Sequence, residues 1–160
     1  MVKIHFSKTN DSAILPARNH GNIVVHETYS DSNFEDPGTH DTGYDIFSCE
    51  KTLVPAKGAS IVPTGVKVAY ITPGYWWKVE SRSGLSFKHG LLAHPGIIDN
   101  QYRGDTGVKM FNHSDTDYIV AKGERIAQLV VYPLINCEVD WAEVQETNRG
   151  EKGFGSSGKH

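Results

Sequence analysis

The chain has 160 residues, of which 38% are apolar and 22% charged, and this supplies enough apolar surface for the core of one domain. Its net charge of −3 does not favour a broad basic face for duplex nucleic acid. No stretch approaches the ~20 apolar residues of a membrane helix, and the start, MVKIHFSKTN, does not read as a signal peptide. Cys49 and Cys137 form no CxxC pair, so we expect neither a disulfide framework nor a structural zinc site. These features predict a cytoplasmic protein with no nucleic-acid or membrane partner.

Short segments with strand-like patterns follow one another along the chain. Residues 62–70 (VPTGVKVAY) alternate, with Val62, Thr64, Val66, Val68 and Tyr70 on one face. Four further segments are rich in β-branched or aromatic residues and are separated by turn signals: 75–80, 107–111, 125–132 and 134–141. Only residues 82–89 have the pattern of a short helix. Many short strands at this spacing predict an all-β domain, either a sandwich or barrel-like.

Two segments differ in composition from the rest. Residues 21–41 are largely polar and rich in turn-forming residues, so we interpret them as an exposed loop. Residues 145–160 (QETNRGEKGFGSSGKH) contain almost no core-forming residues and are predicted to be a flexible C-terminal arm. We therefore divide the chain into a β domain over 1–144 and an arm over 145–160.

The arm contains a partial phosphate-binding signature. Residues 153–160 match the G-x4-G-K part of a P-loop, but His160 stands where Ser or Thr would hold magnesium. No strand-to-helix turn surrounds the match, so a P-loop ATPase is not expected. The backbone N–H groups, with Arg149, Ser156 and Ser157, could still wrap a polyphosphate. A mobile tail without a ligand is the alternative.

Three short motifs in the domain are weak signals when taken singly. Asp99 directly follows two apolar residues, where a carboxylate can serve as a general base at a pocket rim, or simply occupy a turn. Arg82-Ser83-Gly84 is a modest hint of anion binding, and Asp45 in TGYDIFS is unremarkable by itself. The histidines show no metal-binding spacing.

The order of the motifs along the chain is more informative. TGYDIFS (42–48), SRSGLSFKHGL (81–91), PGIIDNQYRGDTGVKMFN (95–112), GERIAQLVV (123–131) and RGEKGFGSSG (149–158) resemble the five ordered motifs of the trimeric dUTPase family. The resemblance spans about residues 42–158, and the arm is similar to that of some phage and viral members. It implies a distorted β jelly roll of the β-clip type. It also implies a homotrimer with sites shared between subunits, and hydrolysis of dUTP to dUMP and pyrophosphate with Mg²⁺.

The resemblance also implies roles for individual residues. Asp99 would activate the attacking water, Tyr102 would stack on the deoxyribose and exclude a 2′-hydroxyl, and Asp45 would meet the magnesium only through water. Main-chain groups of a hairpin at about 93–98 would read the uracil. The implied substrate-binding set is Arg82, Ser83, Gly84, Gly96, Ile98, Tyr102, Gln128, Arg149, Phe154, Gly155, Ser156 and Ser157.

Two alternatives share this fold. A dCTP deaminase, or a bifunctional deaminase–dUTPase, would need an extra general acid or base near the nucleobase. A nucleotide-sensing module without enzymatic activity would bind dUTP and release no pyrophosphate. The Ile-Asp-x-x-Tyr and Gly-Phe-Gly-Ser segments favour dUTP hydrolysis over both.

Overall fold

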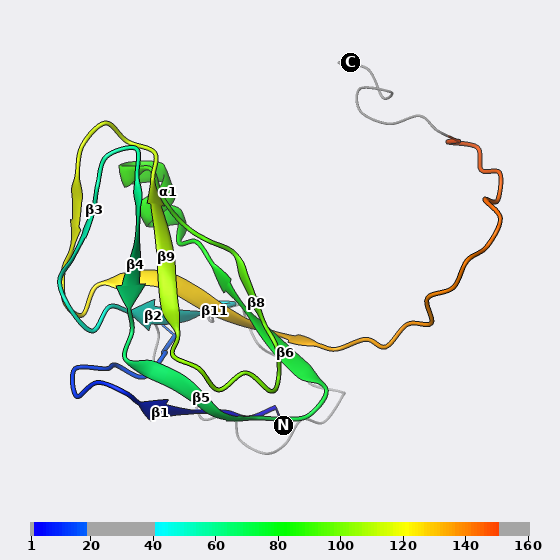
Figure 1. Ribbon diagram of the computed structural model, residues 1–160, viewed down its shortest axis with the longest axis horizontal. Coiled ribbons are helices and arrows are strands. Elements are labelled where there is room, and N and C mark those ends of the chain that lie inside the picture. Colours follow the sequence, from blue (N-terminus) through cyan, green and yellow to red (C-terminus); the bar gives the residue numbers. More distant parts are fainter. Residues whose placement is uncertain (1, 19–40, 151–160) are drawn as a thin grey trace.

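The computed structural model describes residues 2–18 and 41–150, and these residues form mostly β-structure, which confirms the all-β prediction. Within them lie eleven strands and one helix (Figure 1). The elements are β1 (Ile4–Lys8), β2 (Tyr44–Phe47), β3 (Thr52–Val54), β4 (Ala59–Pro63), β5 (Val66–Ile71), β6 (Tyr75–Glu80), α1 (Ser83–His89), β7 (Leu91–Ala93), β8 (Gly96–Ile98), β9 (Gly107–Asn112), β10 (Tyr118–Val120) and β11 (Arg125–Pro133).

The strands form four small sheets, and every strand pair is antiparallel. The largest sheet has the order β2-β11-β6-β8, and a second has the order β4-β9-β7. Two-stranded sheets, β1-β5 and β3-β10, complete the arrangement. In the largest sheet β8 is an edge strand, so one side of its backbone is left unpaired within the described chain.

The core forms where the inward faces of these sheets meet. Alternation places Val108 and Met110 of β9 inside, each at most 1% exposed, while Lys109 between them faces solvent. Trp77 of β6 is the largest fully buried side chain. Burial of a side chain of this kind stabilises the fold by roughly 1.5–3 kcal/mol, which attaches β6 to the core.

The alternating run at 62–70 is two strands rather than one. β4 ends at Pro63 and β5 begins at Val66, and Gly65 between them has a left-handed backbone with φ of 68°. A Cβ at this position would lie 2.7 Å from that of Asn10, so only glycine fits. The prediction of a single strand was wrong because alternation continues across the turn.

Helix α1 confirms the short helix predicted for 82–89. It ends at Gly90, whose left-handed backbone lets its N–H reach the carbonyls of Leu85 and Ser86. Leu85 is 7% exposed and attaches the helix to the core. The helix thus presents Ser83 and Gly84 in its first turn on the outer surface.

Residues 134–141 were predicted as a strand and form none in the described chain. From Leu134 to Gly150 every residue is exposed, and Figure 1 shows this segment running from the end of β11 away from the sheets. β-branched and aromatic residues form a strand only against a partner, and no described segment of the same chain pairs with this one. Within the described chain no helix is long and apolar enough to cross a bilayer.

The expected hairpin at 93–98 is also absent. β7 pairs with β9 and β8 pairs with β6, so the two strands on either side of His94 and Pro95 belong to different sheets. The predicted loop at 21–41 lies outside the described residues except for Asp41. The boundary between domain and arm at 144 stays a prediction.

Candidate active site

Asp99 and Tyr102 line one cavity. Asp99 directly follows the edge strand β8, and the cavity, of about 260 Å³, is bounded by Val79, Ile97, Ile98, Asp99, Tyr102, Asp105, Thr106 and Gly107. Among the described residues none donates a hydrogen bond to the Asp99 carboxylate, and its side chain is exposed. A carboxylate in this position can accept a proton from water.

The ring of Tyr102 packs against Gly104, two residues further along the chain. A Cβ on Gly104 would lie 2.3 Å from the Tyr102 hydroxyl oxygen and 2.5 Å from Cζ, so the ring folds back over a backbone that only glycine can supply. The hydroxyl donates a hydrogen bond of 3.1 Å to the carbonyl of Asp105. The Tyr-Arg-Gly motif therefore builds a fixed aromatic wall beside Asp99.

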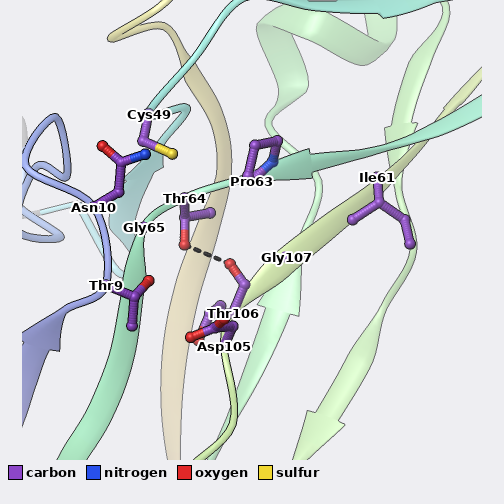
Figure 2. Close-up of a pocket in the computed structure, with 10 residues that line it drawn as sticks. All are labelled: Thr9, Asn10, Cys49, Ile61, Pro63, Thr64, Gly65, Asp105, Thr106 and Gly107. Carbon is purple, nitrogen blue, oxygen red and sulfur yellow. Dashed lines mark hydrogen bonds between the residues drawn. The ribbon is translucent and has the colours of Figure 1, made fainter.

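The residues that follow this motif, 105–107, also line a second cavity of about 510 Å³ (Figure 2). Both cavities are lined by residues 105–107, which separate them. Figure 2 shows the Thr64 hydroxyl donating to the carbonyl of Thr106, and the N–H of Thr106 donates to the carbonyl of Val66 at 3.0 Å. The segment after Tyr102 is thus fastened to the turn between β4 and β5.

A cluster of charged groups lies at the other end of the largest sheet. The Asp45 carboxylate pairs with Arg82 Nε at 2.8 Å through Oδ1 and with Arg125 Nε at 3.4 Å through Oδ2. The Asp45 side chain is 13% exposed and that of Arg82 28%. Two guanidinium groups that share one carboxylate keep net positive charge at a half-buried surface, and such a surface suits an anionic ligand.

Gln128 belongs to the same cluster. Asp45 and Gln128 face each other across β2 and β11, and Gln128 Nε2 donates to the carbonyl of Ser81 at 2.9 Å. A Cβ on Gly43 would lie 2.3 Å from Gln128 Oε1 and 2.9 Å from its Cβ, which explains the glycine in the TGYDIFS motif. Ser83 and Gly84 stand exposed beside Arg82.

The strand register separates these two groups of residues. Ile98 faces Trp77 across β8 and β6, and the chain then continues toward the Tyr75 end of β6. Arg82 follows the other end, five residues beyond Trp77. Since a strand rises by ~3.3 Å per residue, Trp77 lies about 10 Å from the end of β6 at Glu80, and Arg82 follows two residues further along the chain. The cavity lined by Asp99 and Tyr102 includes none of Asp45, Arg82 and Gln128 among the described residues.

The described residues contain no group of three acidic, histidine or cysteine side chains placed to hold a metal ion. Both oxygens of Asp45 are already paired with arginines. This donor set does not form an all-protein cage for magnesium, and it fits an ion held mainly by phosphate oxygens and water.

The arm is only partly described. Arg149 lies in the exposed segment after β11, with neither helix nor strand around it, whereas Phe154, Gly155, Ser156 and Ser157 lie outside the described residues. Gly96 and Ile98 lie on the edge strand β8, whose other side is unpaired among the described residues, and this fits their expected contact with a nucleobase.

Sequence reasoning passed over three residues that the structure places at the two groups. Arg125 shares the Asp45 carboxylate, although it lies in a motif that had been recognised. Gly43 and Gly104 make room for Gln128 and Tyr102. A glycine beside a candidate polar residue was the available signal for both.

Comparison with known proteins places the chain in a family. The fold defines the chain as an all-β protein, and residues 34–158 match the family model described as dUTPase. The chain belongs to the dUTPase family.

Individual relatives support the assignment. The chain is 47% identical over 154 residues to the deoxyuridine 5'-triphosphate nucleotidohydrolase of Oryza sativa subsp. japonica, covering 94% of this chain and 78% of the relative. It is 43% identical over 122 residues to the protein of the same name from Candida albicans, covering 74% and 76%.

Solved structures also resemble this one. A mutant of the Staphylococcus bacteriophage 80alpha dUTPase with dUpNHpp superposes with a TM-score of 0.77 at 30% identity, covering 98% of both chains. A mutant dUTPase from phage phi11 of S. aureus, described with a structural Mg(II) ion, gives a TM-score of 0.70 at 25% identity, covering 91% and 99%.

Proposed function

We propose that this protein hydrolyses dUTP to dUMP and pyrophosphate. The observation that carries the proposal is that the family match, residues 34–158, contains every candidate site residue, Asp99 and its cavity included. The relatives from Oryza sativa and Candida albicans are named for this reaction, and the 80alpha structure contains the analogue dUpNHpp.

Asp99 is the general base in this proposal. Its carboxylate would take a proton from the water that attacks the α-phosphorus, and such assistance is typically worth about 10²–10⁴-fold in rate. Support comes from its position at the end of β8, on the wall of the 260 Å³ cavity and without a donor among the described residues. The cavity accommodates the nucleoside end of the substrate.

Tyr102 and the edge strand β8 select the nucleoside. The ring, held over Gly104, would stack on the deoxyribose and leave no room for a 2′-hydroxyl. Gly96 and Ile98 would present backbone groups to the uracil, because one side of β8 has no strand partner among the described residues. Pro95 has no N–H and cannot donate to the base.

Arg82, Ser83, Gly84 and Gln128 bind the phosphates in this proposal. The ion pair with Asp45 would hold the Arg82 guanidinium in place for charge-assisted hydrogen bonds to phosphate oxygens. A Mg²⁺ ion, when bound with the triphosphate, would neutralise phosphate charge. Asp45 would meet this ion only through its waters.

The separation of Asp99 from Arg82 supports a site assembled between copies. A homotrimer of distorted jelly-roll subunits would place the Asp99 end of one copy against the Arg82 end of the next, three times around the axis. The arm of a neighbouring copy would close the site, with Phe154 over the uracil and Arg149, Gly155, Ser156 and Ser157 at the phosphates. A cytoplasmic location remains a prediction.

The two alternatives gain no support from the relatives, whose names specify dUTP hydrolysis. A single assay separates all three: release of pyrophosphate and of ammonia, measured with dUTP, dCTP, dTTP and UTP. The proposal predicts pyrophosphate from dUTP far above the other nucleotides and no ammonia from dCTP. Release of ammonia would show a deaminase. Binding of dUTP, measured on the same protein, without release of pyrophosphate would show a sensing module.

A further inference from the structure

We propose that Asn100 is a positioning residue that sets the place of Asp99, by fastening the turn that carries Asp99 to the turn between β5 and β6. This inference rests on the proposed role of Asp99 as general base.

The Asn100 amide makes two hydrogen bonds to a distant part of the chain. Its Nδ2 donates to the carbonyl of Thr72 at 3.0 Å and to that of Tyr75 at 2.8 Å. Asn100 is half-buried, whereas Asp99 before it and Gln101 after it are exposed. The side chain therefore points inward exactly where its neighbours face solvent.

The turn is flanked by Ile98, which pairs with Trp77, and by Thr106, which bonds to Val66, but between them few hydrogen bonds reach the rest of the described chain. The N–H of Tyr102 donates to the carbonyl of Asp99 at 3.0 Å, and Arg103 Nη1 donates to the carbonyls of Asn100 and Tyr102. These bonds shape the turn but leave its position open. Of the hydrogen bonds made by residues 99–105 within the described chain, only those of Asn100 Nδ2 reach outside the segment.

The anchoring turn is itself well fixed. Thr72 exchanges hydrogen bonds with Lys3, from its N–H to the Lys3 carbonyl at 2.9 Å and from the Lys3 N–H to its hydroxyl at 2.8 Å. The carbonyl of Gly74 accepts from the N–H of Leu134 at 2.8 Å. Ile71 and Trp77, on either side of the turn, are each 1% exposed. The hydrogen bonds of Asn100 therefore attach the turn that carries Asp99 to a rigid part of the fold.

The chemistry of the site selects asparagine. The side chain must supply two N–H donors to two carbonyl oxygens within one residue of the base, and a carboxamide of this length does so. An aspartate has the same shape but would turn a carboxylate oxygen toward those carbonyls. Alanine would leave both carbonyls without this donor.

Loss of the anchor should displace Asp99 more than Tyr102. Tyr102 is held by its packing over Gly104 and its bond to Asp105, and Thr106 beyond it is bonded to Thr64 and Val66. A displacement of the base by about 1 Å can cost about 10²-fold in rate. We therefore expect kcat to fall while the choice between dUTP and UTP is kept.

The test compares Asn100→Ala and Asn100→Asp with the wild-type protein. We expect kcat for dUTP to fall by about 10- to 100-fold in both, with the affinity for dUpNHpp and the dUTP-to-UTP ratio of kcat/KM within about threefold of wild type. The neighbouring Gln101→Ala variant, which removes an exposed amide, serves as the matched control and should keep wild-type kcat. Thermal unfolding of each variant confirms that it is folded.

Two results would overturn the inference. One is a kcat within twofold of wild type in folded Asn100→Ala and Asn100→Asp. The other is a parallel loss of kcat, analogue affinity and sugar selectivity, which indicates general disruption of the pocket. The proposed function fails separately, since in that case the wild-type protein itself releases no pyrophosphate from dUTP.

Discussion

Replacing Gly104 by alanine should loosen the sugar selectivity of the site without altering the general base, Asp99. The new Cβ would lie 2.3 Å from the Tyr102 hydroxyl oxygen, 2.5 Å from Cζ and 2.9 Å from Cε2, whereas ordinary contacts begin at 3.4 Å. The ring must therefore move by about 1 Å, and because Tyr102 is 47% exposed its side chain can rotate outward into solvent. This movement also breaks its hydroxyl bond to the Asp105 carbonyl, worth about 0.5–1.5 kcal/mol.

A displacement of about 1 Å in a positioning contact can cost about 10²-fold, so we expect the dUTP-to-UTP ratio of kcat/KM to fall by at least about tenfold. The assay is pyrophosphate release from both nucleotides at several concentrations. Tyr102→Phe is the matched control, because it removes the hydroxyl bond and keeps the ring in place, and should leave the ratio within about threefold. An unchanged ratio in folded Gly104→Ala would refute the assignment of the ring as the wall.

Two further predictions follow from single contacts. Gly43→Ala should push Gln128 off the Ser81 carbonyl and raise the KM for dUTP by about 5- to 10-fold, the value of one hydrogen bond; an unchanged KM would remove Gln128 from the phosphate site. Burial and the hydrogen bond to Glu124 raise the pKa of Tyr118 to about 12, above its ordinary value near 10. The neutral phenol therefore stabilises the fold below pH ~10, and this contribution is lost as the pH rises toward 12. In urea titrations, the unfolding free energy of Tyr118→Phe should decline less over that pH range than that of the wild type. An identical decline would contradict the upward shift of the Tyr118 pKa.

The sequence predicted the strands best where burial alternates and turns are marked by their residues. The segment 75–80 coincides with β6 because Trp77 and Val79 face the core and Pro73-Gly74 forms the preceding turn. The run at 62–70 misled because Gly65 bends the chain without interrupting the alternation. Residues 134–141 have strand-forming composition, but strand formation depends on a partner that local sequence does not specify.

The sequence supplies the candidate site residues, whereas their placement within one copy of the chain comes from the structure. Motif order identified Asp99 and Arg82, yet their positions at opposite ends of β6 follow from strand register, which is a tertiary property. Asn100 escaped notice for a related reason. Its partners are the backbone carbonyls of Thr72 and Tyr75, about 25 residues away, and no side-chain pattern records such a contact.

The most direct test of the account is complementation between two inactive variants, Asp99→Asn and Arg82→Ala. Each alone should release almost no pyrophosphate from dUTP, because each lacks one half of every site. Unfolded together in equal amounts and refolded, they should regain activity in about a quarter of all sites. A site works only when its Asp99 comes from an Arg82→Ala chain and its Arg82 comes from an Asp99→Asn chain. Light scattering confirms assembly of the mixture. A refolded trimer that stays as inactive as the two parents would show that Asp99 and Arg82 act within one copy, and would contradict the shared site.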